Sequence, residues 1–199
     1  MNTRLATIAL LTLAVPAALV AHPGHGPADF AAGAMHPLQG LDHLLAMLAV
    51  GLLGVRTALA PGGDRRALWL IPGAFLMAML AGGLIALAGV PLPGAEWGIA
   101  LSVLVFGSIL ALARPARTAV ACAVVAAFAV CHGHAHIAEM GAGDAGAYAT
   151  GFLATTTVLH AAGLGLGMLV ACSWSGASLR VAGGLIACAS LALMSGLIG

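Results

Sequence analysis

Apolar residues gather in six long segments along this chain, and polar residues are confined mainly to the short breaks between them. The segments run over 37–58, 67–90, 95–113, 117–139, 147–172 and 180–198. Each is close to the ~20 apolar residues that an α-helix needs to cross the hydrocarbon core of a bilayer. Backbone groups in lipid must find partners within their own segment, and the alternating pattern of barrel strands is absent. The pattern therefore predicts an all-α membrane protein built as a six-helix transmembrane bundle.

The N-terminal segment has the pattern of a secretory signal peptide. Arg4 supplies the positive charge, residues 8–20 supply the apolar core, and Ala21 offers a small residue at a cleavage point. Cleavage there divides the chain into a signal peptide, 1–21, and a mature transmembrane domain, 22–199. The alternatives are cleavage after Ala18 and an uncleaved first helix.

Small residues inside the apolar segments predict close helix packing. The patches are Gly82-Gly83, Gly163-x-Gly165-x-Gly167 and Gly183-Gly184. Without side chains at these positions, the backbones of two membrane helices can approach each other closely. We expect these glycines to lie at helix interfaces.

The arginines predict how the helices are oriented. After Arg4 they all fall in or directly beside alternate breaks, at Arg56, Arg65, Arg66, Arg114, Arg117 and Arg180. Positive residues mark cytoplasmic loops, so both mature termini are predicted to lie outside. The acidic residues occupy the opposite side, at Asp29, Glu96, Glu139 and Asp144, and only Asp64 lies beside two arginines. The orientation thus agrees with a cleaved signal peptide.

Composition narrows the class of protein further. Hydrophobic residues make up 62% of the chain and charged residues only 7%, which is too apolar for a soluble domain of this size. The formal net charge of +1 argues against nucleic acid as a partner. The four cysteines form no C-x-x-C pair, so we interpret them as packing residues rather than a disulfide set.

Two imidazoles and a carboxylate stand at the start of the first mature segment: His36, Asp42 and His43. Pro37 suits the first turn of a helix, so His36 is expected at or just before the N-cap. Imidazole and carboxylate together form a ligand set for divalent transition metals. Asp42 would be either a direct ligand or a partner that accepts a histidine N–H. The alternative is a carboxylate that stabilises the helix dipole, with interfacial histidines.

A second cluster ends the fourth segment. His132, His136 and Glu139 have i, i+4, i+7 spacing, so a helix places them on one side, and His134 faces elsewhere. The set resembles a two-histidine, one-carboxylate metal site. The alternative is a polar helix end with interfacial histidines, and Cys131 is interpreted as a packing thiol.

The predicted topology places both clusters at the outer membrane face, about 90 residues apart in sequence. Glu96 opens the third segment on that same side. His160 lies about 12 residues into the fifth segment, roughly 18 Å deep and near the midplane. It is either a ligand on a pathway or a hydrogen-bond partner between helices.

These motifs resemble the HupE/UreJ family. The resemblance rests on the runs His36-x5-Asp42-His43-Leu-Leu-Ala-Met47 and His132-Gly133-x-Ala135-His136-x-x-Glu139, the signal peptide and the six helices. It covers essentially the whole mature chain and implies a nickel permease tied to hydrogenase or urease maturation, with cobalt as the ion of some members. Cys131, where the family usually has Phe, and the extra His134 depart from the pattern and favour softer ions such as Cu or Zn.

The sequence therefore predicts a multi-pass permease of the bacterial inner membrane that imports Ni²⁺ or Co²⁺. The predicted metal residues are His36, Asp42, His43, Glu96, His132, His136, Glu139 and His160. We expect no enzymatic activity and no prosthetic group; the ion is the cargo, and the bilayer is the other partner. Whether the chain forms an oligomer, or passes metal to maturation proteins of a metalloenzyme, stays open.

Two other classes of protein could use histidines of these clusters to bind a metal ion or a haem. A membrane metal chaperone or sensor would share the outer site but would need no polar residue at the midplane, so His160 weighs against it. A bis-histidine haem protein needs two histidines at matched depth, which His132 and His160 do not have. The motifs G-x-x-x-x-G-K-[ST] and H-E-x-x-H are absent, so neither ATP hydrolysis nor zinc-protease chemistry is expected.

Overall fold

The computed structural model describes residues 28–112, 116–173 and 176–197. Within these ranges the chain is helical, apart from one isolated bridge between Ala28 and Gly143. The predicted signal peptide, 1–21, lies outside the described residues. The prediction of an all-α protein is confirmed for the described part of the chain.

A short helix, α2 (Phe30–Met35), and a 3₁₀ turn, η1 (His36–Leu38), precede six long helices. The long helices are α3 (Leu41–Ala58), α4 (Ala67–Leu87), α5 (Ala95–Ala111), α6 (Thr118–Ala138), α7 (Ala145–Ser173) and α8 (Gly176–Met194). All of them except α5 are long and apolar enough to cross a membrane. With 17 residues, α5 is about 26 Å long, a little short of a hydrocarbon core.

The start of the first long helix differs from the sequence prediction. We expected a span from residue 37 with His36 at or just before its N-cap, but the predicted start is wrong, because α3 begins at Leu41. Pro37 occupies the first turn of η1 instead. The chain is extended at Gly40, with φ −107° and ψ 127°, which separates η1 from α3. His36 is therefore carried by a separate short segment that the sequence did not reveal.

This short segment is fastened at its N-terminal end. The Asp29 side chain caps α2 by accepting the amide of Ala32 at 2.8 Å. Ala28 exchanges backbone hydrogen bonds with Ala142 and Asp144, just before α7. The close packing of α2 along α7 then holds His36 over the end of the bundle.

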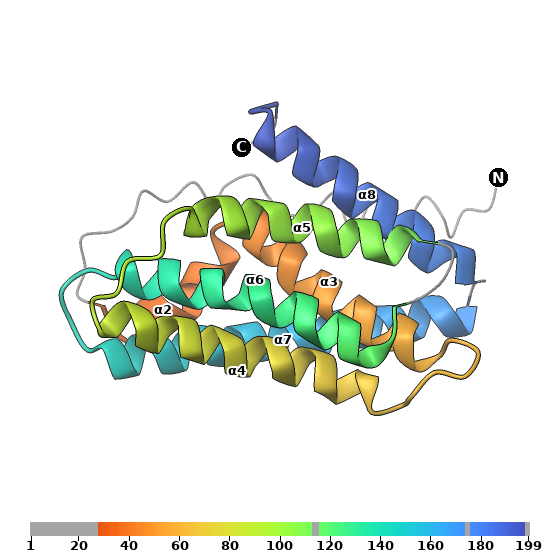
Figure 1. The fold of residues 1–199 in the computed structure, drawn as a ribbon, viewed down its shortest axis with the longest axis horizontal. Helices are drawn as coiled ribbons and strands as arrows, with labels where there is room; N and C mark the ends of the chain where they lie inside the picture. The colour runs from red at the N-terminus through yellow and green to blue at the C-terminus, as the bar shows by residue number, and fades with distance from the viewer. Residues whose placement is uncertain (1–27, 113–115, 174–175, 198–199) are drawn as a thin grey trace.

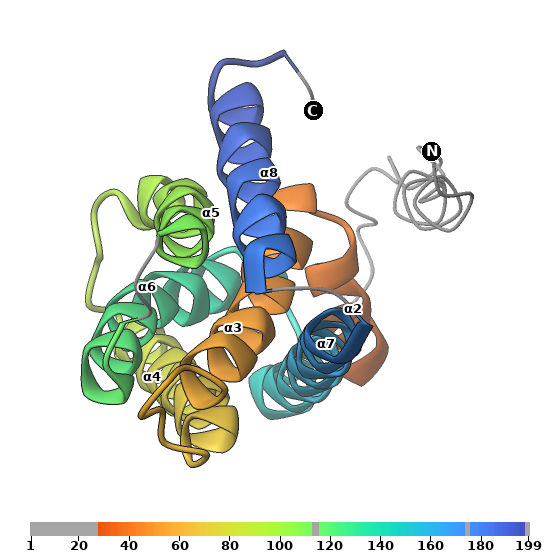
Figure 2. The same ribbon diagram turned by 90° about the vertical axis from the view of Figure 1, so that its right-hand side faces the viewer.

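Most of the long helices run roughly side by side with α3 at the centre, whereas α8 is tilted and its C-terminal end projects away from them (Figures 1 and 2). Two thirds of its span is buried, a larger share than in any other candidate span of the described chain. The closest pairs are α4 with α6, α5 with α8, and α3 with α7. Residues near the N-terminus of α3 are thus in reach of side chains from several helices.

Glycines permit this close packing, but not all the predicted ones do. A Cβ on Gly163 would lie 2.4 Å from the carbonyl oxygen of Leu48, and one on Gly167 would lie 2.9 Å from Val55. Gly165 has nothing within 4 Å of its Cβ position, so its predicted interface role is wrong. A helix turns about 100° per residue, so positions two apart face opposite ways.

Opposite charges gather at the two ends of the described bundle. At one end, Arg56 donates to the carbonyl of Leu112, and Arg180 donates to that of Ala111 at 3.2 Å, so two guanidinium groups meet the C-terminus of α5. The other end carries Asp29, Glu96, Glu139 and Asp144, and we call it the acidic end. This separation agrees with the predicted alternation of loops.

The glycine contacts predict a difference between two neighbouring substitutions. Gly163→Ala forces α3 and α7 apart and should destabilise the protein by about 1–3 kcal/mol, whereas Gly165→Ala should be neutral or slightly stabilising. Thermal unfolding in detergent would measure both. Equal losses in the two variants would contradict the α3–α7 packing.

Candidate metal site

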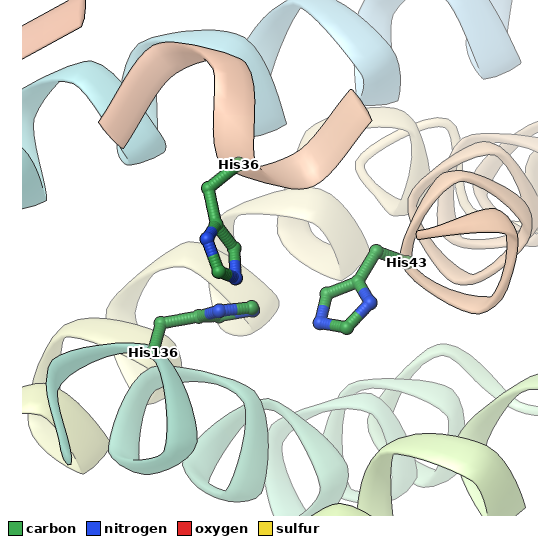
Figure 3. A group of neighbouring side chains, drawn as sticks. All are labelled: His36, His43 and His136. Atoms are coloured by element: carbon green, nitrogen blue, oxygen red, sulfur yellow. The ribbon is translucent and has the colours of Figure 1, made fainter. Parts of the chain in front are cut away.

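Three histidines from three different elements meet at the acidic end of the bundle. His36 comes from η1, His43 from the first turn of α3 and His136 from the last turn of α6 (Figure 3). One ligand atom from each ring lies within 4.8 Å of the others. We call this group the three-histidine cluster.

The rings of the cluster face one another closely. The ring centroids of His36 and His136 are 4.4 Å apart, those of His43 and His136 are 4.5 Å apart, and those of His36 and His43 are 6.1 Å apart. Imidazole nitrogens bind a divalent ion such as Zn²⁺ at about 2.0–2.1 Å, so the three rings would have to move closer together to share one ion. The two sequence motifs, far apart in the chain, are thus joined in one group, as the topology predicted.

Asp42 supports His43. Its Oδ1 accepts the Nδ1–H of His43 at 2.7 Å and the backbone N–H of His43 at 2.8 Å. A donated Nδ1–H leaves Nε2 of His43 with its lone pair available, which is the arrangement of metal-binding histidines. Of the two predicted roles for Asp42, direct ligand or hydrogen-bond partner, this geometry favours the partner.

His136 is the most deeply buried member of the cluster. It is 2% exposed, and neither ring nitrogen has a hydrogen-bond partner among the described residues. Its ring lies against Phe152, with a centroid distance of 4.2 Å. A small cavity of about 50 Å³ beside it, between α4, α6 and α7, has mainly apolar walls. The nearest rings that carry nitrogen atoms are those of His36 and His43, the other members of the cluster.

The electrostatics of the cluster favour a neutral His36. Burial lowers the pKa of His36, and the nearby His43 lowers it further, while the carboxylates of Asp42 and Glu96 oppose the change. A neutral imidazole at physiological pH can offer a lone pair to a metal ion.

Glu96 and Glu139 form a carboxyl pair near the cluster. Glu96 lies in the first turn of α5, and Glu139 is the C-cap of α6. A hydrogen bond with Glu96, then burial, then the charge of Glu96 raise the pKa of Glu139 to about 7. The pair therefore retains a proton near neutral pH, which a divalent cation would displace.

The remaining predicted histidines lie deeper. The ring centroid of His132 is 5.6 Å from that of His43 and 6.5 Å from that of His136. His160, from the middle of α7, contacts Phe75 rather than the three-histidine cluster. Neither belongs to the three-histidine cluster, although His132 contacts His43 of that cluster.

The two departures from the family pattern point away from the cluster. His134 uses Nε2 to donate to the carbonyl of Val90 at 2.8 Å, which ties the α4–α5 loop to α6. Cys131 packs over Gly98 of α5, where a Cβ would lie 2.6 Å from its sulfur. Neither side chain belongs to the three-histidine cluster, so these two residues give no reason to expect a softer ion there.

Sequence reasoning missed the aromatic wall of the site. Phe152 and Tyr148 of α7 both lie near His36, with ring centroid distances of 6.3 Å and 6.1 Å. Their i, i+4 spacing puts them on one helix face, but nothing in the sequence pairs that face with histidines of α6 and η1.

Comparisons with known proteins agree over nearly the whole chain. The model of the family described as HupE / UreJ protein matches residues 8–193. The chain is also 40% identical over 191 residues to Protein HupE of Rhizobium leguminosarum bv. viciae, covering 96% of this chain and 97% of that protein. No solved structure matches the chain.

The carboxyl pair predicts a pH dependence of stability. Because the pKa of Glu139 is about 7 in the fold and near 4.5 when unfolded, the folded state binds more protons between these values. The contribution of Glu139 to stability should therefore fall as pH rises from 4.5 to 7. Glu139→Gln should remove the part of the pH-dependent loss of stability that Glu139 causes. Thermal unfolding in detergent with a chelator, at pH 5 and at pH 8, would measure this.

The wild type is the matched control, because the opposite contribution of His36 is common to both proteins. Parallel pH profiles for wild type and Glu139→Gln would contradict the shared proton.

Proposed function

The chain belongs to the HupE/UreJ family, and from that premise we propose that it is a permease that imports Ni²⁺, with Co²⁺ as the alternative ion. The observation that carries the proposal is the meeting of His36, His43 and His136 at one end of a bundle of apolar helices. Imidazole ligands suit nickel and cobalt, and three rings from separate elements form a site that small motions can open.

In the proposed mechanism the cation exchanges its water ligands for protein ligands in steps. The Glu96–Glu139 pair attracts the hydrated cation at the acidic end and releases its proton. The three-histidine cluster then replaces part of the hydration shell, with Asp42 holding His43 in the binding tautomer. Binding of this kind must be weak enough for release, as in any conduction pathway.

We also propose how the chain is arranged in the membrane. Residues 1–21 act as a cleaved signal peptide, and 22–199 form a six-helix permease domain in the inner membrane. The short α5 spans by local thinning of the bilayer. The arginine end faces the cytoplasm and the acidic end faces outward, in keeping with the positive-inside rule.

The second candidate function is that of a metal chaperone or sensor, which would use the same three-histidine cluster. It would bind the ion at the acidic end and transfer it to a partner without moving it through the membrane. His132 and His160, buried beneath the cluster, favour the permease.

Binding should depend on His136 and not on His134. His136→Ala removes a member of the cluster and should weaken nickel binding by about 10- to 100-fold or more, since the loss of even a supporting partner costs that much. His134→Ala, two residues away on the same helix, loses only its bond to Val90 and should bind as wild type does. Isothermal titration of purified protein in detergent measures both. The site assignment fails if the two variants bind equally.

Transport is tested by radiolabelled nickel uptake in cells that lack their own high-affinity importer. Wild type should accumulate nickel, His43→Ala should not, and Asp42→Asn should lose about 10- to 100-fold in apparent affinity because the supporting carboxylate is gone. Unlabelled Co²⁺, Zn²⁺ and Cu²⁺ serve as competitors, at matched expression. Binding without uptake would replace the permease by the chaperone or sensor, and stronger competition by another ion would change the metal.

A further inference from the structure

Two histidines lie buried beneath the three-histidine cluster. His132 of α6 is 0% exposed and His160 of α7 is 2% exposed. Each has a ring nitrogen, Nε2, with no hydrogen-bond partner within the described part of the chain. Buried polar atoms without a hydrogen-bond partner are rare in native proteins, and each one needs a physical explanation.

The other nitrogen of each ring makes a specific bond. Nδ1 of His132 donates to the carbonyl of Phe128 at 3.0 Å, and Nδ1 of His160 donates to the carbonyl of Met47 at 2.9 Å. A carbonyl only accepts, so the hydrogen must be on Nδ1 and the lone pair on Nε2. Both rings are thus held in the tautomer that binds a metal ion through Nε2.

The ring of Phe75 connects the two histidines in space. Its centroid lies 5.3 Å from that of His132 and 5.1 Å from that of His160, in edge-to-face contact with both. His132 in turn contacts His43, with centroids 5.6 Å apart. Rings in contact, His43, His132, Phe75 and His160 in turn, therefore lead from the three-histidine cluster towards the middle of α7.

A buried hydroxyl group lies on the same helix face as His160. Thr156 is 0% exposed, and its Oγ1 has no hydrogen-bond partner among the described residues. It lies four residues before His160, on the same face of α7 and about 6 Å nearer the acidic end. The adjacent threonines behave differently, since Thr155 donates to Ala34 and Thr157 donates to Leu153.

We propose that His132, Thr156 and His160 form an inner site, through which the divalent transition-metal cation passes after it leaves the three-histidine cluster. The inference rests on the proposed permease function and adds the route below the cluster. Two Nε2 lone pairs and one hydroxyl oxygen supply neutral ligands, which hold a cation without the strong attraction of a carboxylate and so permit release.

The test separates binding from transport. His160→Leu keeps a similar volume and removes the inner imidazole, while the three-histidine cluster remains intact. Nickel binding by isothermal titration should stay within about threefold of wild type, whereas uptake per folded molecule should fall by roughly 10- to 100-fold, the range of a lost partner at a metal site. A merely structural histidine would lower the melting temperature and leave uptake per folded molecule unchanged.

A matched pair of threonine variants keeps the inference testable if His160→Leu does not fold. Thr156→Val removes the unpaired hydroxyl and should lower the rate of nickel uptake several-fold. Thr157→Val removes a hydroxyl from the next residue, which is exposed, and should leave uptake unchanged. Wild-type uptake by both His160→Leu and Thr156→Val would overturn the inner site but not the permease. Absence of uptake by wild type itself would overturn both.

Discussion

Burying imidazole rings in so apolar a chain is the constraint on which the rest of the structure depends. Within lipid, a polar atom must find its partner in the protein. His43 meets this need by donating to Asp42, and His132 and His160 do so by donating to backbone carbonyls. These bonds satisfy one nitrogen of each ring and leave a lone pair on the other. The polar atoms that stay unpaired are thus largely acceptors, and a line of buried acceptors is suited to a cation.

The close packing of the helices is what brings these rings together. A Cβ on Gly133 would lie 1.8 Å from the carbonyl oxygen of Met79, so α4 and α6 touch directly beside His132. Likewise, a Cβ on Gly51 would lie 2.4 Å from the carbonyl oxygen of His160, which keeps α3 against α7. The short distance between α3 and α7 lets His160 reach the carbonyl of Met47. Packing and ligand geometry therefore have the same physical origin.

The last turns of α6 illustrate how a helix divides its polar residues between tasks. His132 and His136 face the centre of the bundle, while His134, between them in sequence, ties down the α4–α5 loop at Val90. That loop leads into Glu96, whose carboxyl group meets Glu139 at the end of α6. One helix end thus supplies rings for the cluster and also positions the carboxyl pair beside it.

The sequence by itself determined the helices, their approximate bounds and the separation of charge between the two ends, because length, hydropathy and arginine placement are local properties. It also determined that His132 and His136 share a face, since helical spacing is fixed. Only the tertiary structure decided that His36 stands on its own short segment before Gly40, that Asp42 bonds to His43, and that Gly165 is not at an interface. The joining of three elements in one cluster likewise depended on contacts between residues far apart in the chain, which no local pattern encodes.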